Sequence, residues 1–241
     1  STLAKEAGLA LGMKGSILVN DRMETSAPDI YAVGDAVQVK HYVTGHDALI
    51  ALAGPANKQG RIVADNICGI KTKFKGSMGT SILKIFDLTA AATGNNERTL
   101  QRLGIDYQVA FVHPNNHASY YPGATQINIK LIFDNKGRIL GAQAMGYEGV
   151  DKFVDVIATV IKFRGTVEDL AELELAYAPP YLSAKSPANM AGFVGQNILS
   201  GLVEMVKPEY VETMDRNKEL LLDVRSDIEV EAGSIEGYMN I

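Results

Sequence analysis

The run Thr25-Ser-Ala-Pro-Asp-Ile-Tyr-Ala-Val-Gly-Asp-Ala36 decides how the first part of this chain is interpreted. It predicts a turn, a short buried strand over residues 30–33, and a Gly-Asp pair at the carboxyl end of that strand. In open α/β sheets, ligands bind outside the carboxyl ends of the strands. Gly34 lets the backbone approach a ligand closely, and Asp35 provides an acceptor for sugar hydroxyls. The run therefore predicts a ligand-binding strand end in an α/β layer.

The full run resembles the second flavin-binding motif of the FAD-dependent pyridine nucleotide-disulfide oxidoreductases. In that family the aspartate holds the ribityl chain of FAD, so the resemblance implies that Gly34 and Asp35 bind this cofactor. Ala53-Gly-Pro-Ala-Asn-Lys-Gln-Gly-Arg61 resembles the helix near the flavin in the coenzyme A-disulfide reductase and NADH oxidase branch. That likeness implies a flavin contact at Ala53 and a coenzyme A contact at Asn57.

Two features of the family are missing from the sequence. No GxGxxG motif opens a helix for a pyrophosphate, and no nicotinamide motif is present. The single cysteine, Cys68, does not match the position of the family's redox cysteine, and we expect it to be a small buried hydrophobic residue. The chain thus resembles the carboxyl half of a larger flavoprotein. We expect the NAD(P)H site to lie elsewhere and this piece alone to be inactive.

Composition fits a cytoplasmic enzyme. The chain has 241 residues, of which 46% are hydrophobic, a net charge of −5 and one cysteine. These values argue against nucleic acid as a partner and against a disulfide framework. No apolar stretch approaches the roughly 20 residues of a membrane span, so no membrane partner is expected. His113 and His117 are four residues apart, but Pro114 breaks a helical face between them, and no metal site is expected.

We predict three segments along the chain. Residues 1–73 form the carboxyl-terminal part of an FAD/NAD-binding region, residues 74–206 a dimerisation domain, and residues 207–241 the incomplete start of a rhodanese-like domain. The expected fold class is an α/β flavin-domain remnant plus an α+β domain, an antiparallel sheet with helices on one face. The pattern predicts strands at residues 16–19, 81–86, 107–112, 125–133 and 138–145, and helices at 56–67, 95–103, 150–161 and 187–206.

Turn and cap residues add to this pattern. Asp134-Asn-Lys-Gly137 predicts a hairpin turn between the last two strands, Gly104 is expected to end the helix at 95–103, and Thr166-Val-Glu-Asp169 predicts a capping box. The last helix carries more apolar residues than one small core needs, so we expect these residues to form a dimer interface: Met190, Phe193, Val194 and Ile198.

The middle segment resembles the dimerisation domain of the same oxidoreductases. The resemblance is carried by Ser119-Tyr-Tyr-Pro-Gly-Ala124, Ala176-Tyr-Ala-Pro-Pro-Tyr181 and Lys185-Ser-Pro-Ala-Asn-Met-Ala-Gly192. It implies that Tyr120 and Tyr177 reach across a homodimer towards the partner's cysteine and flavin. A phenol can donate a proton to a thiolate leaving group, so these two are the candidate catalytic residues. Lys185 is the candidate contact for a coenzyme A phosphate, and sequence alone leaves open whether Tyr120 or Tyr121 faces the site.

The last segment resembles the opening of a rhodanese domain. That family begins with a buried strand ending in D-V-R, which Leu220-Leu-Leu-Asp-Val-Arg225 resembles, and Glu231-Ala-Gly-Ser-Ile-Glu-Gly-Tyr-Met-Asn-Ile241 follows with the family's G-x-I-x-G-x-x-N-I pattern. The resemblances together imply an enzyme that moves electrons from NAD(P)H through FAD to a cysteine and on to a disulfide or persulfide, such as coenzyme A disulfide. Two alternatives stay open: an NADH oxidase or peroxidase, and, for the isolated piece, a homodimerisation module without catalysis.

Overall fold

The computed structural model describes residues 2–206 and 209–241. Two compact units divide the chain, Ser1–Val203 and Glu204–Ile241. Residue 207, the predicted first residue of the third segment, lies outside the described residues. Within the described part of the chain, no helix is both long and apolar enough to cross a membrane.

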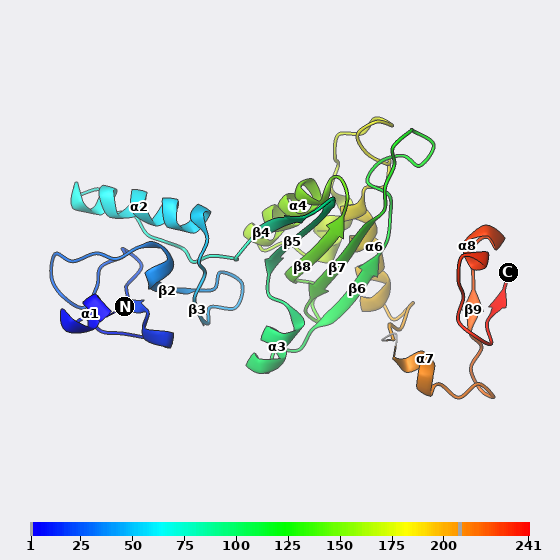
Figure 1. The fold of residues 1–241 in the computed structure, drawn as a ribbon, viewed down its shortest axis with the longest axis horizontal. Helices are drawn as coiled ribbons and strands as arrows, with labels where there is room; N and C mark the ends of the chain where they lie inside the picture. The colour runs from blue at the N-terminus through cyan, green and yellow to red at the C-terminus, as the bar shows by residue number, and fades with distance from the viewer. Residues whose placement is uncertain (1, 207–208) are drawn as a thin grey trace. The chain divides into compact units, whose positions relative to one another are not determined.

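The first part of the larger unit is a small α/β layer. Strand β1 (Ile17–Leu18) pairs parallel with β2 (Val37–Lys40), which pairs antiparallel with β3 (Asp47–Ala48). Its remaining elements are α1 (Thr2–Glu6), η1 (Met13–Gly15), η2 (Gly34–Ala36) and α2 (Ala53–Ile67), drawn in blue to cyan in Figure 1. A small core of buried residues holds the layer together: Ala4, Ile17, Val37 and Val39.

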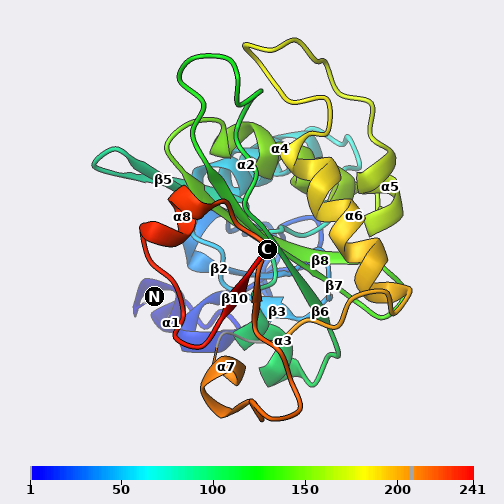
Figure 2. The same ribbon diagram turned by 90° about the vertical axis from the view of Figure 1, so that its right-hand side faces the viewer.

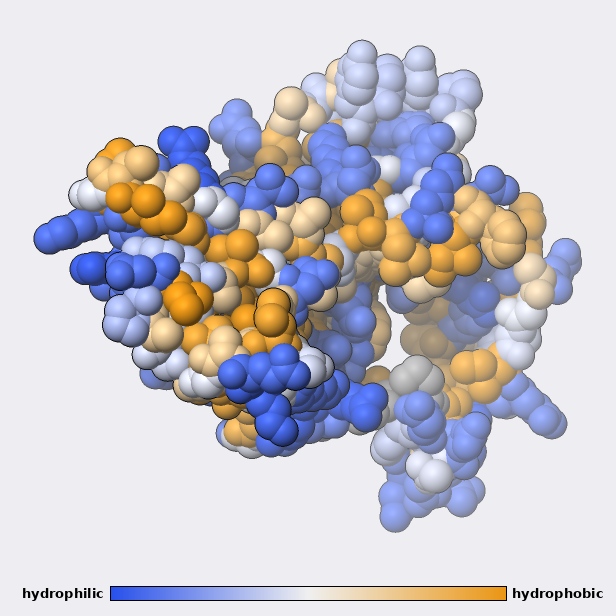
Figure 3. Space-filling model, turned by 60° about the vertical axis from the view of Figure 1, so that its left-hand side comes forward, coloured by the Kyte–Doolittle hydropathy of each residue, from blue (hydrophilic) through white to orange (hydrophobic). Residues whose placement is uncertain are grey.

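The predicted strand over residues 30–33 is wrong. Tyr31 forms an isolated bridge with Glu24, and Gly34 begins a 3-10 turn. Ile30 and Val33 are exposed, at 42% and 39%. A strand that is apolar on both faces needs neighbours on both sides, and no other described strand pairs with these residues. In Figure 3, hydrophobic residues reach the surface at several places among hydrophilic ones.

A five-stranded antiparallel sheet forms the centre of the larger unit, in the order β4-β5-β8-β7-β6. The strands are β4 (Ser81–Ile85), β5 (Leu88–Gly94), β6 (Gln108–Val112), β7 (Ile127–Phe133) and β8 (Ile139–Gly146). The predicted hairpin of β7 and β8 is confirmed, with Ile129 opposite Ala144. Helix α3 (Glu97–Leu103) ends at Gly104 in the left-handed conformation, as predicted.

Helices cover one face of this sheet, which confirms the predicted α+β layer (Figures 1 and 2). Helix α4 (Val150–Lys162) packs on β5 and β8, while α6 (Pro187–Leu199) packs on β6, β7 and α5 (Val167–Glu172). The predicted capping box from Thr166 to Asp169 begins α5. The main core lies between sheet and helices, and its largest fully buried side chains are Phe133, Phe153, Leu100, Ile127, Ile129, Leu131, Ile132, Ile139, Ile157, Leu170 and Leu182.

The predicted carboxyl-terminal end of α6 is wrong. The helix ends at Leu199 instead of continuing to residue 206. Met190, Val194 and Ile198 pack against the core of their own chain, so they do not form the free apolar face that the pattern suggested. Phe193 is the residue of that pattern that remains exposed, at 37%.

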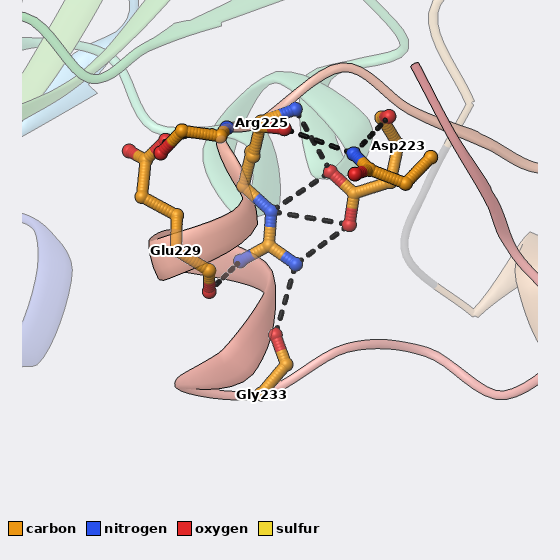
Figure 4. Close-up of polar contacts among 6 residues, drawn as sticks. Asp223, Arg225, Glu229 and Gly233 are labelled. Atoms are coloured by element: carbon orange, nitrogen blue, oxygen red, sulfur yellow. Dashed lines mark hydrogen bonds and ion pairs between the residues drawn. The ribbon is translucent and has the colours of Figure 1, made fainter.

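The smaller unit contains α7 (Tyr210–Thr213), β9 (Leu222–Asp223), α8 (Asp227–Glu231) and β10 (Met239–Asn240), with β9 and β10 parallel. Polar contacts around Arg225 connect the segments of this unit (Figure 4). The guanidinium pairs with Asp223 and donates to the Gly233 carbonyl at 2.9 Å. Val224 and Ile228 are 72% and 81% exposed, so the unit buries little apolar surface of its own.

Candidate functional site

The Gly-Asp turn lies against helix α2. Gly34 has a φ of +77°, a backbone conformation that side-chain-bearing residues rarely adopt. Its N–H donates to Oε1 of Gln59 at 2.7 Å, and Gln59 is 1% exposed. Asp35, the next residue, is exposed, so its carboxylate acts as an acceptor without the desolvation penalty of a buried charge. The α2 side chain thus holds the turn in place while the carboxylate faces outward.

The first turn of α2 supplies hydrogen-bond donors. The side chain of the N-cap residue, Leu52, accepts no hydrogen bond from the first backbone N–H groups of the helix. Asn57 lies one turn further and donates from Nδ2 to the Ala53 carbonyl at 3.0 Å. Outward acceptors at Asp35 and backbone donors near Ala53 fit the hydroxyls of a ribityl chain and the carbonyls of a flavin ring.

Tyr120 and Tyr177 come together. Their hydroxyl oxygens lie 3.2 Å apart, although the residues are 57 positions apart in the chain. Tyr120 is on the loop between β6 and β7, and Tyr177 is on the loop between α5 and α6. The hydrogen bond to Tyr177 raises the pKa of Tyr120 above its ordinary value. Both rings are accessible, at 74% and 48% exposure, so another molecule can reach the hydroxyls.

Tyr121 points elsewhere. Its ring packs edge-on against the His117 ring, with centroids 5.9 Å apart and an interplanar angle of 73°. In this chain Tyr120, and not its neighbour, is therefore the tyrosine that meets Tyr177.

Lys185 is exposed at the end of the loop that carries Tyr177. It directly precedes Ser186, the N-cap residue of α6. The candidate residues therefore fall into two groups: Gly34, Asp35, Ala53 and Asn57 around α2, and Tyr120, Tyr177 and Lys185 on two loops. Among the described residues, no hydrogen bond or ion pair joins one group to the other.

The expectation for Cys68 is wrong. The thiol is exposed, because Cys68 is the C-cap residue where α2 ends at the surface. His113 donates from Nδ1 to Oδ1 of Asn128 at 2.6 Å, whereas His117 is buried. In residues 2–206 and 209–241, no three histidine, cysteine or acidic residues lie in a group able to hold a metal ion.

A second histidine pair was not expected from the sequence. The rings of His41 and His46 stack with centroids 5.0 Å apart, beside a cavity of about 650 Å³. Burial, followed by the nearby charge of His46, lowers the pKa of His41 to about 4. Nδ1 of His41 lies 3.3 Å from Nδ2 of Asn95, so the pair links the loop after β2 to the start of α3.

Four buried amides also escaped the sequence interpretation: Gln59, Asn95, Asn116 and Asn189. They are 1%, 4%, 6% and 7% exposed. Amide side chains are usually exposed, so a pattern of apolar and polar residues gives no reason to place them inside. Asn189 does stand three residues after Ser186, and this spacing of a helix N-cap is a signal that the sequence carries.

Comparisons with known proteins give the same family for both parts of the larger unit. Residues 1–60 match the family described as "Pyridine nucleotide-disulphide oxidoreductase", and residues 80–188 match "Pyridine nucleotide-disulphide oxidoreductase, dimerisation domain". The coenzyme A disulfide reductase of Staphylococcus haemolyticus (strain JCSC1435) is 36% identical over 200 residues, which are 82% of this chain and 45% of that protein.

Two solved structures are similar over the whole chain. The structure titled "Crystal structure of reduced Bacillus anthracis CoADR-RHD" is 52% identical with a TM-score of 0.95, covering 100% of this chain and 44% of that one. The NAD-dependent persulfide reductase from A. fulgidus is 38% identical with a TM-score of 0.92, with the same coverage of 100% and 44%. The chain thus spans less than half the length of these relatives.

Proposed function

Because the chain belongs to the pyridine nucleotide-disulphide oxidoreductase family, we propose that it forms part of an FAD-dependent NAD(P)H oxidoreductase that reduces a disulfide or persulfide. Coenzyme A disulfide is the proposed substrate, in keeping with the relatives named for coenzyme A disulfide and persulfide reduction. The observation that carries the proposal is the pairing of the Tyr120 and Tyr177 hydroxyls on two exposed loops.

The tyrosine pair suits the chemistry of disulfide cleavage. When a thiolate attacks a disulfide, the S–S bond breaks and the second sulfur departs as a thiolate. A phenol of pKa near 10 is protonated at neutral pH, so it can donate a hydrogen bond or its proton to that sulfur. Tyr177 is the proposed donor, and the hydrogen bond between the two hydroxyls orients it. We propose that the chain forms a homodimer in which this tyrosine pair reaches across the interface towards the cysteine and flavin of the partner subunit.

FAD would be held by Gly34, Asp35 and Ala53 of one chain, with Tyr177 of the partner subunit near it, and would supply electron transfer from the nicotinamide. The hydrogen bond from the Gly34 N–H to Gln59 would fix the turn that is proposed to face the ribityl chain. Asn57 and Lys185 are the proposed contacts to coenzyme A. An ammonium group on an exposed stem suits a phosphate because it acts as a mobile point charge.

We propose the same division of labour along the chain that the sequence suggested: residues 1–73 for flavin binding, 74–206 for dimerisation and 207–241 as the start of a rhodanese-like domain. The last assignment rests on the strand β9 and on the Asp223–Arg225 pair within the D-V-R motif (Figure 4).

The test is Tyr177→Phe in the complete enzyme. The ring and its packing stay, while the hydroxyl is lost. Reduction of coenzyme A disulfide should slow by roughly ten- to ten-thousand-fold, the usual range for general acid help. Steady-state turnover measures the change. Flavin content and melting temperature should barely move, because the Tyr177 side chain is exposed and one such hydrogen bond contributes about 1 kcal/mol at most.

Tyr121→Phe is the matched control, since its ring contacts His117 and not Tyr177. This variant should turn over at the parent rate. Full turnover in Tyr177→Phe would make that hydroxyl structural and remove the catalytic assignment.

A further inference from the structure

Two loops carry the paired tyrosines, and a buried asparagine lies at the base of each. We define the Tyr120 loop as residues 117–124 and the Tyr177 loop as residues 174–185. We propose that Asn116 and Asn189 are positioning residues that set these loops so that the two hydroxyls meet. The proposal rests on the function proposed above for Tyr120 and Tyr177.

Asn116 closes the Tyr120 loop through its side-chain oxygen. Oδ1 accepts from the N–H of His117 at 3.0 Å and from the N–H of Thr125 at 2.9 Å. The Asn116 N–H in turn donates to the Thr125 carbonyl at 2.9 Å. One residue therefore binds the first position of the loop and the position that follows its end.

Asn189 closes the Tyr177 loop with both ends of its amide. Oδ1 accepts from the N–H and the hydroxyl of Ser186, at 3.1 and 2.6 Å, directly after the loop. Nδ2 donates to the carbonyls of Leu170, Ala171 and Leu173, at 3.3, 3.0 and 2.9 Å, just before the loop begins. The oxygen completes the cap of α6, whereas the nitrogen reaches the end of α5.

The nitrogen contacts separate loop positioning from helix capping. The capping box of α6 requires from the side chain of residue 189 only an acceptor for the Ser186 N–H. The donor contacts to three carbonyls at the end of α5 are additional, and only an amide provides them together with the acceptor. At Asn116, by contrast, Oδ1 accepts both of the hydrogen bonds that close the loop.

The two sites therefore respond differently to the same change. Asn116→Asp keeps an acceptor for both N–H groups, so the Tyr120 loop should stay closed. Asn189→Asp keeps the helix cap, but replaces the donor with an oxygen that faces carbonyls, so the start of the Tyr177 loop should open. Alanine at either position removes all of the side-chain contacts.

Oxidative tyrosine coupling in the 241-residue chain tests this without any activity measurement. Brief photo-oxidation links tyrosines whose rings are close, and peptide mapping identifies the Tyr120–Tyr177 product. We expect the yield of this product to fall about tenfold in Asn116→Ala and Asn189→Asp, since at least two ordinary hydrogen bonds are lost in each. Asn116→Asp should stay within about twofold of the parent. Tyr177→Phe cannot form this product, so its signal gives the background of the measurement.

Circular dichroism shows which variants remain folded, and only those are compared. Should Asn189→Ala not fold, Asn189→Asp and the two Asn116 variants still decide the matter. A parental coupling yield in folded Asn116→Ala or Asn189→Asp would overturn the proposal, as would a loss in Asn116→Asp equal to that in Asn116→Ala. A lower melting temperature alone would leave the coupling yield unchanged, which separates positioning from general stability.

Turnover of the same variants in the complete enzyme separates this inference from the proposed function. Loss of coupling together with loss of turnover supports both. Loss of coupling with parental turnover keeps the positioning role and removes the catalytic role of the tyrosines.

Discussion

At the scale of single residues, the proposed chemistry depends on the contact between the Tyr120 and Tyr177 hydroxyls, whose oxygens lie 3.2 Å apart. The motifs named Tyr120 and Tyr177 separately, but the hydroxyl contact between them depends on where two loops end in space. The neighbouring Tyr121 has the same chemistry, and only its contact with His117 distinguishes it. Side-chain direction in a loop has no period, so sequence could not decide between these neighbours.

Lys185 allows a test of recognition apart from chemistry. Lys185→Ala should raise KM for coenzyme A disulfide while kcat stays nearly unchanged, because the side chain is exposed and would bind substrate and transition state equally. Lys136→Ala, at the exposed turn between β7 and β8, is the matched control and should leave both constants alone. A fall in kcat with constant KM would contradict the assignment of Lys185 to binding.

His41 should make folding stability depend on pH. The pKa of His41 is lowered to about 4 in the folded protein, from 6.5 in the unfolded chain. Between these values the unfolded state binds more protons, so stability should fall as the pH drops from 6.5 to about 4. Below that range this group causes no further change. We expect a loss of about 2 kcal/mol, after allowance for solvent screening.

Urea denaturation at a series of pH values measures this effect. His41→Asn keeps an acceptor near the position of Nδ1 and should flatten the slope in this pH range. His113→Gln, at an exposed position, is the matched control and should keep it. An unchanged slope in His41→Asn would mean that other groups carry the pH dependence.

At the scale of elements, periodicity and capping signals predicted most of the larger unit. Helix α4 and the β7–β8 hairpin were found because their apolar residues recur at clear spacing. Strand β5 was missed, since Leu88-Thr-Ala-Ala-Ala-Thr-Gly94 is rich in alanine, which is depleted in strands. Small side chains suit this strand because it lies between β4 and β8 with α4 packed on it. Tertiary packing, not local propensity, explains its conformation.

Two helix glycines should respond in opposite directions to alanine. At Gly192 in α6, a Cβ would lie 2.5 Å from the backbone nitrogen of Ala171 in α5, so Gly192→Ala should destabilise by about 1–3 kcal/mol through overpacking. At Gly60 in α2, a Cβ would meet no atom outside its own helix within 4 Å, so Gly60→Ala should stabilise by about 0.5–1 kcal/mol. Denaturant unfolding of both variants gives the comparison. Equal effects would show that helix propensity alone governs both positions.

At the scale of the whole molecule, the sequence predicted the order of the segments but not which surfaces stay uncovered. The apolar residues of α6 were assigned to an interface, yet most of them serve the core of their own chain. The opposite face of the sheet has no covering helix among the described elements, and it exposes Leu83, Phe111 and Met145 at 54%, 42% and 45%. A cavity of about 410 Å³ lies between these side chains.

We expect this chain to form a twofold-symmetric dimer, since an exposed apolar surface of this kind is typical of an interface. Light scattering should give twice the chain mass of 25.9 kDa. Phe111→Asp, on the open sheet face, should weaken the dimer more than Phe193→Asp on α6. The other apolar residues predicted for an α6 interface pack against the core of their own chain, so Phe193 stands alone there, whereas Phe111 has exposed apolar neighbours. The reverse order would return the interface to the helix side. A chain that stays monomeric at high concentration would remove the dimer, and with it the route by which Tyr177 reaches a partner's flavin.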